Sequence, residues 1–366
     1  MDWENLIREE TRALKPWEDP ALELLSESKP IEIVRLSTSE NYFIEKQWLD
    51  TLFEEVMKEV DLRSYPIERS LNARRAMAEF FGVDVNEIVI GNGSDELIEL
   101  LPRVFIDPGD EVVAIDPTFS VYKISIELAS GRYTPVPLEE NFSLDNNEII
   151  KEISAKTKFI VMCSPNNPTG NQFSEEQIRE LLNQTDKIVI VDEAYVEFAD
   201  YSILPLIREF DNLIVFSTFS KSAGIAGLRL GFLFTNKALA SYFLRVIGPF
   251  SVNLIAQQMT IKLLQNFDYV RKKAEEIKKE REYLGKELSK FPVTVFPSKA
   301  NFLLVKVQSD DLSATEVVNG LMKKGILVRD LSSHPLLENC FRTAVGTREM
   351  NTILINALKD IFEGIE

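Results

Sequence analysis

The sequence predicts an α/β protein with a large, mainly parallel sheet between helices and a second, smaller α/β domain. Short apolar runs rich in Val and Ile alternate with helical patterns from about residue 88 to residue 234. Such alternation is typical of a parallel sheet that is buried on both faces. After one long charged helical segment the alternation resumes and continues toward the C-terminus. The length of 366 residues leaves room for two domains.

The first 30 residues are expected to form a polar, partly helical arm. Three prolines interrupt this arm, because proline disfavours the continuation of a helix. Two helical patterns follow, and the glycine after the second, Gly82, is expected to end it in the left-handed conformation. These two patterns cover residues 45–61 and 70–81.

The central part of the chain alternates between strands and helices. Each expected strand is a short run of aliphatic or aromatic residues next to a polar or glycine-rich turn. Strands are expected over residues 88–90, 111–115, 158–163, 187–191, 213–216 and 231–234. Helices are expected over residues 97–105, 122–128 and 174–182.

The C-terminal part begins with one long charged helix over residues 269–281, a pattern typical of a solvent-exposed helix with ion pairs four residues apart. Strands are expected over residues 301–307 and 326–329. We therefore expect three parts. They are an N-terminal arm with part of the small domain over 1–45, a large domain over 46–265 and a small domain over 266–366.

The charge of the chain excludes several kinds of partner. With 41 Lys and Arg against 58 Asp and Glu, the net charge is −17, which argues against nucleic acid and against an anionic membrane surface. No apolar run approaches the roughly 20 residues of a membrane-spanning helix. The N-terminus has no signal-peptide pattern. Two cysteines cannot form a disulfide framework, so a cytoplasmic location is expected.

The chain has a single histidine, His334, so it offers no multi-histidine metal site and we expect no metal. A Ser-His-Asp or Cys-His arrangement would have to use this residue. It lies in a polar turn, which favours a place at the surface or at a pocket rim. Cys163 and Cys340 are expected to be small buried apolar residues. An enzyme of this composition must move protons with other groups.

Polar segments follow several of the expected strands, at the strand ends where open α/β sheets bind ligands. The backbone N–H groups of Ser94 and Asp95 in Gly91–Glu96 would point at an anion, although a simple helix cap explains them equally well. Phe119, in the segment 116–122, is suited to lie on a planar ring or to belong to the core.

Two further segments carry polar side chains at strand ends. Asn167 lies in a turn rich in Pro and Asn, where its amide suits a phenolate or carboxylate as well as an ordinary turn. Asp192 directly follows four aliphatic residues. A buried carboxylate is costly unless it is paired or hydrogen-bonded, so Asp192 is expected to need a positive partner. Tyr195 follows three residues later.

Lys221 stands among small and apolar residues, an environment that lowers the pKa of a lysine and favours nucleophilic amine chemistry. Thr218, Ser220 and Arg229 offer donors for a phosphate close to it. Together the residues of these five segments are suited to bind a planar ligand that has a phosphate, a ring nitrogen, a ring oxygen and a carbonyl group. Pyridoxal 5′-phosphate has these groups, and it pairs a Schiff-base lysine with an acid on its ring nitrogen.

Six motifs occur in one order along the chain: Gly-Asn-Gly-Ser-Asp-Glu, Pro-Thr-Phe-x-x-Tyr, Asn-Asn-Pro-Thr-Gly, Asp-Glu-Ala-Tyr, Thr-Phe-Ser-Lys and Ala-Gly-Leu-Arg-Leu-Gly. This order resembles the fold-type I pyridoxal-phosphate aminotransferases, most closely the histidinol-phosphate aminotransferase family. The resemblance runs from about Leu36 to the C-terminus. It implies a seven-stranded, mainly parallel sheet in the large domain, and a small domain built from the C-terminal part and the N-terminal arm.

The resemblance implies a role for each matching residue. Lys221 would hold the cofactor as an internal aldimine and move the proton. Asp192 would bind the ring nitrogen, and Asn167 with Tyr195 would bind the phenolate oxygen. Phe119 would stack on the ring. The phosphate would be bound by the remaining residues, which are Ser94, Asp95, Thr218, Ser220, Arg229 and, across a homodimer interface, Tyr65.

The resemblance also implies a substrate site. Arg342 would bind the substrate anion and Arg329 would lie near a substrate phosphate, since a guanidinium suits both anions. The chain departs from the family in its arm, where Trp17 replaces a substrate-contacting tyrosine and residues 39–42 read Ser-Glu-Asn-Tyr instead of Asn-Glu-Asn-Pro. These departures leave the amino donor open. The substrate-binding candidates are Arg342, Arg329, Trp17, Tyr65 and Asn167.

The implied reaction transfers the amino group of L-histidinol phosphate to 2-oxoglutarate. The products are imidazole-acetol phosphate and L-glutamate, formed in a ping-pong cycle of histidine biosynthesis. Two alternatives keep the fold: a phosphothreonine decarboxylase-like enzyme and an aromatic amino acid aminotransferase. A third, a non-catalytic regulatory protein with this fold, would normally need a DNA-reading module, which the sequence does not show.

Overall fold

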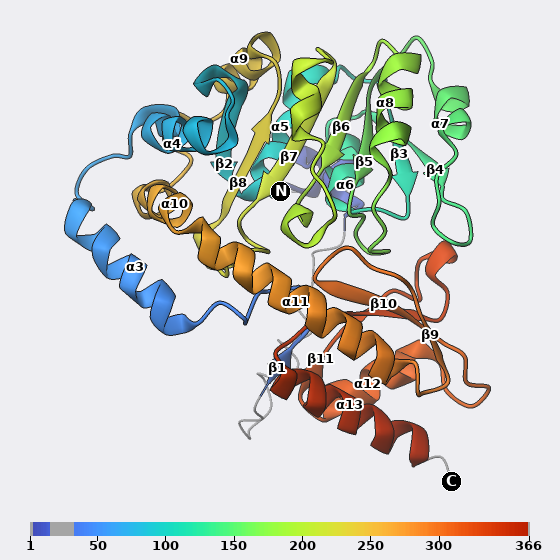
Figure 1. Cartoon of the computed structure of the whole chain (residues 1–366). Helices are drawn as coiled ribbons and strands as arrows, with labels where there is room; N and C mark the ends of the chain where they lie inside the picture. Colours follow the sequence, from blue (N-terminus) through green and yellow to red (C-terminus); the bar gives the residue numbers. More distant parts are fainter. Residues whose placement is uncertain (1–2, 15–32, 365–366) are drawn as a thin grey trace.

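The computed structural model describes residues 3–14 and 33–364. Its centre is a seven-stranded sheet with the strand order β2-β8-β7-β6-β5-β3-β4 (Figure 1). All neighbouring strands are parallel except that β8 runs antiparallel to both β2 and β7. The prediction of a large, mainly parallel sheet is therefore confirmed. The strands are β2 Ile88–Asn92, β3 Glu111–Asp116, β4 Arg132–Pro137, β5 Thr157–Cys163, β6 Ile188–Asp192, β7 Leu213–Thr218 and β8 Leu230–Phe234.

Helices cover this sheet on both faces (Figure 1). Successive residues of β6 show this, because Val189 and Val191 belong to one buried hydrophobic cluster and Ile190 to another. Burial on both faces explains why the central strands are continuous apolar runs. The helices of this part are α4 Leu71–Phe81, α5 Gly93–Phe105, α6 Val121–Leu128, α7 Asn146–Glu152, α8 Glu175–Gln184, α9 Lys237–Val246 and α10 Leu254–Gln265.

One strand of the large sheet is absent from the sequence prediction. β4 contains Pro135 and Pro137, and within the sheet it pairs only with β3, because it lies at the edge. Proline cannot donate a ladder hydrogen bond and is therefore confined to edge strands. The same two prolines hide the strand from a search for β-rich patterns.

A second sheet lies below the first in Figure 1 and has the order β12-β13-β10-β9. Its three pairings are all antiparallel. The short strand β1 Val34–Arg35 pairs with β11 Ile326–Leu327 and joins the N-terminal segment to this part. The remaining elements are β9 Val293–Val295, β10 Phe302–Val307, β12 Arg329–Asp330, β13 Cys340–Ala344, α11 Phe267–Leu288, α12 Ala314–Lys323 and α13 Arg348–Glu363.

This arrangement confirms the predicted fold class, a large α/β layer with a smaller α/β unit. The long helix α11 begins at Phe267, close to the predicted boundary between residues 265 and 266. The boundaries at 45 and 265 remain a proposal, which the two separate sheets support. The strands β9 and β13 were not predicted, since β9 has three residues and β13 includes a polar Arg-Thr pair.

The predicted helices agree with the structure with small shifts. α4 ends at Phe81, and Gly82 follows with a φ of +67° in the left-handed conformation, as predicted. α5 begins at Gly93, four residues earlier than expected, so that Ser94 and Asp95 lie in its first turn. The other helices are α1 Glu9–Arg12, α3 Lys46–Glu59 and short 3-10 helices at Trp3–Leu6, Glu68–Ser70, Val85–Glu87, Val196–Phe198, Leu204–Arg208, Ala226–Leu228 and Pro335–Leu337.

The described part of the N-terminal arm, residues 3–14, contains two short helical turns. Trp17 lies outside the described residues, so its predicted contact with the substrate has no structural counterpart here. Across the ranges 3–14 and 33–364, none of the helices has both the length and the apolar character needed to cross a membrane.

Candidate active site

The predicted site residues of the large sheet converge at its carboxyl edge. Strand pairing places Asp192 beside Cys163 of β5 on one side and beside Phe216 of β7 on the other. The segments with Asn167 and Lys221 continue directly from β5 and β7. The first turn of α5 follows β2. Parallel strands thus bring four separate segments of the chain to one edge, as expected for an open α/β sheet.

Asp192 is almost completely buried, with a relative exposure of 4%. Its Oδ2 accepts a hydrogen bond of 2.9 Å from the Tyr122 hydroxyl, and its Oδ1 accepts one of 3.0 Å from the backbone N–H of Ala194. Among the described residues no Lys or Arg forms an ion pair with it. Burial raises the pKa of Asp192, and the Tyr122 hydrogen bond opposes this effect. The expected positive partner is thus replaced, within the chain, by two neutral donors.

Lys221 lies just after β7, and its Nζ donates a hydrogen bond of 2.9 Å to the carbonyl oxygen of Thr38. Burial, the largest cause, and the charge of Arg342 together lower the pKa of Lys221 to about 8, while the charge of Glu40 opposes this shift. A lysine with such a pKa releases its proton near neutral pH, as a nucleophile or general base requires. The environment predicted for Lys221 from its apolar neighbours is the one observed.

The first turn of α5 forms a cradle with Arg229. No side chain caps the N-terminus of this helix, so its first N–H groups remain available to an anion. Nη2 of Arg229 donates a hydrogen bond of 2.6 Å to Oδ2 of Asp95. A Cβ atom on Gly93, which has a φ of +86°, would lie 2.6 Å from Nη2 of Arg229. A Cβ atom on Gly231 would lie 2.2 Å from the backbone nitrogen of Ser94.

Both glycines are thus required by the close approach of the helix, the strand and the guanidinium group.

Thr218 and Ser220 lie on the same side of Lys221 in sequence and are both buried. The Thr218 hydroxyl lies 3.0 Å from Oγ of Ser220 and donates to the carbonyl oxygen of Leu230 at 2.6 Å. Apart from Tyr65, the predicted phosphate-binding residues therefore lie between the end of β7 and the start of β8 and in the adjacent first turn of α5.

Arg342 connects the second sheet to the first. It lies on β13 with 8% exposure, and its guanidinium donates to the Asn167 side-chain oxygen and, at 2.6 Å, to the carbonyl oxygen of Ser37. No described carboxylate lies within ion-pair distance of it, and its Nε has no hydrogen-bond partner among the described residues. Burial lowers the pKa of Arg342, and the charge of Arg329 adds to this effect.

Arg329 lies directly opposite Arg342 in the pairing of β12 with β13. Two guanidinium-bearing residues at one register position concentrate positive charge at the end of the second sheet. In a chain with a net charge of −17, such a local field is favourable for anions although the whole molecule is acidic.

Two aromatic residues of the prediction lie beside these groups. Tyr195 is buried, and its ring packs edge-on against Phe302 with centroids 5.0 Å apart. Burial raises the pKa of Tyr195 to about 12, whereas Arg342 acts in the opposite direction. Phe119 is half-buried and lies edge-on to Tyr122, with centroids 6.4 Å apart. Tyr195 thus belongs to the buried hydrophobic cluster around the second sheet, whereas Phe119 packs at the edge of a cluster of the large sheet.

The structure does not bring every predicted residue to this edge. Tyr65 is 80% exposed and stacks on Phe250, with ring centroids 4.9 Å apart. His334 lies 3.2 Å from Oδ1 of Asp116 through its Nε2, at the rim where the second sheet meets the end of β3. This position agrees with the expectation of a pocket-rim histidine. Cys163 and Cys340 are free and buried, also as expected.

Two features of the site are absent from the sequence prediction. Tyr122 is not among the predicted site residues, yet its hydroxyl donates a hydrogen bond to Asp192. The bent segment 36–39, just after β1, supplies backbone carbonyls to Arg342 and Lys221 through Ser37 and Thr38. The Pro-Thr-Phe-x-x-Tyr motif contains a signal for Tyr122, whereas backbone carbonyls leave no signal in a sequence.

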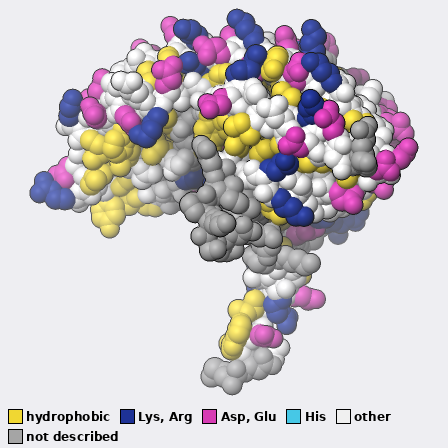
Figure 2. All heavy atoms as spheres, turned by 90° about the horizontal axis from the view of Figure 1, so that it is seen from below, with side chains coloured by type: hydrophobic (Ala, Val, Ile, Leu, Met, Phe, Trp, Pro, Cys, Tyr) yellow, Lys and Arg dark blue, Asp and Glu magenta, His cyan; other side chains and the backbone are white. Residues whose placement is uncertain are grey.

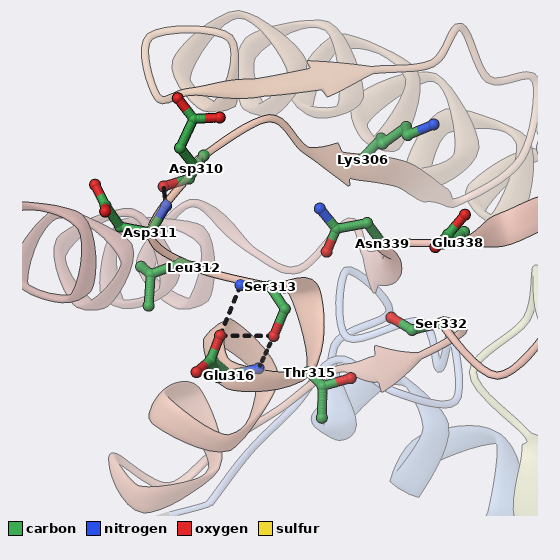
Figure 3. Close-up of a pocket in the computed structure, with 11 residues that line it drawn as sticks. Lys306, Asp310, Asp311, Leu312, Ser313, Thr315, Glu316, Ser332, Glu338 and Asn339 are labelled. Carbon is green, nitrogen blue, oxygen red and sulfur yellow. Dashed lines mark hydrogen bonds between the residues drawn. The ribbon is translucent and has the colours of Figure 1, made fainter.

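The structure also contains a cavity of about 680 Å³ away from these residues (Figure 3). It lies between the end of β10 and the start of α12, and its lining includes Asp310, Asp311, Glu316 and Glu338 with one lysine, Lys306. None of the predicted site residues lines it. Since four carboxylates repel anions, this cavity does not suit the anionic ligand that the sequence predicts.

Comparison with known proteins agrees with the family resemblance that the sequence motifs predict. The family Aminotransferase class I and II matches residues 31–358. The histidinol-phosphate aminotransferase of Thermoanaerobacter pseudethanolicus is 37% identical over 360 residues, covering 98% of this chain and 99% of that protein.

Two solved structures share the fold. Histidinol-phosphate aminotransferase from Sinorhizobium meliloti, in complex with pyridoxal-5′-phosphate, matches with a TM-score of 0.89 and 22% identity over 98% of both chains. L-threonine-O-3-phosphate decarboxylase from Porphyromonas gingivalis matches with a TM-score of 0.79 and 24% identity, covering 90% of this chain and all of that one. At such identities these two matches demonstrate the shared architecture alone.

The family match and the full-length relative confirm the resemblance that the motifs predicted. The carboxyl-edge site has the lysine, the buried acid and the anion cradle in the segments that carry those motifs. This chain therefore belongs to the class I and II aminotransferase family, and it is an aminotransferase.

Proposed function

We propose that this aminotransferase uses pyridoxal 5′-phosphate and transfers the amino group of L-histidinol phosphate to 2-oxoglutarate. The observation that carries the proposal is the site itself, in which a lysine with a pKa of about 8 lies at the same sheet edge as a buried carboxylate and an uncapped helix N-terminus. The names of the full-length relatives support the choice of substrate.

The residues present fit this cofactor. The N–H groups of Ser94 and Asp95 with Arg229 would hold its phosphate, because a helix N-terminus and a guanidinium both attract that anion. Asp192 would bind the ring nitrogen, since a buried carboxylate without a cation is stabilised by one. The amide nitrogen of Asn167 and the hydroxyl of Tyr195 would bind the ring oxygen. Phe119 would cover one face of the ring, with Thr218 and Ser220 beside the phosphate.

When bound, the cofactor supplies an aldehyde that takes up amino groups and a ring that withdraws electrons from the substrate α-carbon. Lys221 would provide the amine that holds the cofactor and, when free, the base that takes the α-proton. A pKa of about 8 leaves roughly a tenth of its Nζ neutral at pH 7, much more than for an ordinary lysine. The carbonyl of Thr38 orients this amine, as its hydrogen bond of 2.9 Å to Nζ indicates.

The substrate would be bound from the second sheet. Arg342, buried and without a carboxylate partner among the described residues, would bind the substrate anion. Arg329, opposite it in the sheet, would add charge for a phosphate. One pocket with two guanidinium groups suits both the phosphate of the donor and the distal carboxylate of 2-oxoglutarate. Trp17 and Asn167 remain candidates for further substrate contacts.

We also propose that the enzyme is a homodimer in which Tyr65 reaches the phosphate of the partner's site. Tyr65 stacks on Phe250 and both rings are exposed, as are Leu62 and Ile67, which are near Tyr65 in the sequence. Figure 2 shows hydrophobic side chains gathered on the left of the molecule, the side on which α3 lies in Figure 1. Exposed apolar area of this kind marks protein interfaces.

We also propose a cytoplasmic location, which the two free cysteines support.

A half-reaction screen tests the proposal. The enzyme loaded with pyridoxal 5′-phosphate is mixed with L-histidinol phosphate, L-phenylalanine or O-phospho-L-threonine, and its visible absorption is followed before 2-oxoglutarate is added. We expect L-histidinol phosphate to bleach the absorption with the highest rate per concentration and to yield glutamate. Release of carbon dioxide from O-phospho-L-threonine, or a faster reaction with L-phenylalanine, would contradict the proposed substrate.

A further inference from the structure

The hydroxyl of Tyr122 lies against the carboxylate that would meet the cofactor. Tyr122 belongs to α6 and has no exposed surface. Its oxygen donates to Oδ2 of Asp192 at 2.9 Å, while Oδ1 accepts from the backbone of Ala194 at 3.0 Å. Among the described residues, each carboxylate oxygen therefore has one donor, and Tyr122 is the side chain that hydrogen-bonds to Asp192.

The ring of Tyr122 is fixed by its neighbours. It packs edge-on against Phe119 and Phe216, in each case with centroids 6.4 Å apart. Burial and the adjacent Asp192 raise the pKa of Tyr122 well above its ordinary value. The hydroxyl therefore keeps its proton at neutral pH and remains a donor. A rigid, permanently protonated donor on a buried carboxylate stabilises the ionised form of that carboxylate.

We propose that Tyr122 is a positioning residue for the cofactor: its hydrogen bond keeps Asp192 ionised and fixes the orientation of the carboxylate toward the ring nitrogen. This inference rests on the proposed function, because it requires a ring nitrogen at Asp192. The same hydrogen bond draws charge from the carboxylate and lowers its affinity for a proton. The proton shared between the ring and Asp192 is thereby kept on the ring nitrogen.

Binding of the cofactor to the apoenzyme tests the proposal without reference to turnover. The titration uses wild type, Tyr122→Phe, Asp192→Asn and the double variant, with pyridoxal 5′-phosphate and with an analogue that has carbon in place of the ring nitrogen. We expect Tyr122→Phe to weaken cofactor binding about tenfold, the effect of one hydrogen bond to a charged group. The double variant should bind no more weakly than Asp192→Asn alone.

The analogue separates positioning from a general structural defect. Without a ring nitrogen, wild type and Tyr122→Phe should bind it with the same Kd. Tyr133→Phe is the matched control, because Tyr133 lies on the edge strand β4 and its hydroxyl makes no hydrogen bond to Asp192. This control should leave both Kd values unchanged.

Three results would overturn the inference. They are an unchanged Kd for pyridoxal 5′-phosphate in Tyr122→Phe, an equal loss for cofactor and analogue, or losses that multiply in the double variant. If Tyr122→Phe does not fold, the cofactor Kd of Asp192→Asn is compared with that of the double variant, since the buried charge is absent from both. Equal Kd values would then support the inference, and weaker binding by the double variant would overturn it. Failure of wild type to bind the cofactor at all would instead refute the proposed function, and the inference with it.

Discussion

The two ends of the candidate site differ in the burial and the ion pairing of their arginines. Arg229, at the end formed by the large sheet, is paired with Asp95 at 2.6 Å, and both side chains are nearly half exposed. Arg342, at the end formed by the second sheet, is 8% exposed and donates to the neutral oxygens of Asn167 and Ser37. Within the described part of the chain, Arg229 forms an ion pair with a carboxylate and Arg342 does not.

This difference suggests a division of work between the two ends. A buried charge without a counterion costs free energy that an incoming anion recovers. The Arg342 end should therefore gain most from an anion that enters and leaves in each half-reaction. At the Arg229 end the helix N-terminus adds to a charge that is already paired, which suits an anion that stays bound. Variants at the two ends should then separate substrate effects from cofactor effects.

The largest effect is expected at Lys221, between the two ends. Lys221→Ala removes the amine that holds the cofactor and moves the α-proton, so transamination should fall by at least roughly 10⁴-fold. Rapid mixing with L-histidinol phosphate, followed by glutamate detection, measures this loss. Circular dichroism serves as the folding control. Turnover within about tenfold of wild type would remove Lys221 from the mechanism.

Arg342→Ala should lower kcat/KM for 2-oxoglutarate by roughly 10²- to 10³-fold, because it removes a buried charge from the substrate anion. The Kd of pyridoxal 5′-phosphate should stay within about threefold of wild type. Steady-state kinetics and cofactor titration give the two values. The comparison between the two ends breaks down if cofactor binding falls as much as kcat/KM does.

Arg229→Ala should show the converse, with cofactor binding weakened by roughly 10- to 100-fold. At saturating cofactor the KM for 2-oxoglutarate should change little. Equilibrium dialysis of the apoenzyme measures the first quantity, and kinetics at high cofactor concentration measure the second. A KM that rises while cofactor affinity is unchanged would reverse the assignment of the two ends.

Glu193, next to Asp192 in the large sheet, provides a pH test. Burial raises its pKa to about 8 from an ordinary 4.5, although Ser202 and the N–H of Ile203 donate to it. A group with a raised folded-state pKa contributes stability below about pH 4.5, and this contribution is lost as the pH rises through about 8. Glu193→Gln does not titrate, so its stability relative to wild type should increase with pH over this window.

The increase should be at most about 1.4 kcal/mol per pH unit. Urea unfolding of both proteins at several pH values from 5 to about 8 measures it. The neighbouring Glu197 titrates in both proteins and so contributes little to the difference. A difference in stability that does not depend on pH would show that Glu193 is already ionised in the folded protein.

The smallest effect is expected at His334, which joins the rim of the second sheet to Asp116 at 3.2 Å. Both side chains are about 30% exposed, and partly exposed polar pairs of this kind contribute between 0 and about 1 kcal/mol. His334→Asn should therefore change unfolding free energy by less than about 1 kcal/mol and turnover by less than about twofold. A tenfold loss of turnover would assign His334 to the chemistry.

The sequence predicts those properties of the site residues that depend on their immediate neighbours in the chain. Four aliphatic residues before Asp192 predict its burial, and the small neighbours of Lys221 predict its lowered pKa. The partners of these groups depend on distant segments instead. Thr38 lies 183 residues from Lys221, and Ser37 lies 305 residues from Arg342. Such contacts arise because the segment after β1 packs against residues of both larger sheets, and they leave no periodic pattern.

The central claim is that Lys221 is the amine that carries the cofactor, and borohydride reduction tests it directly. The enzyme is loaded with pyridoxal 5′-phosphate, reduced, digested and analysed by peptide mass spectrometry. The mass of the reduced cofactor should appear on the peptide that contains Lys221 and on no other. Attachment to a different lysine, or a protein without attached cofactor, would contradict the claim.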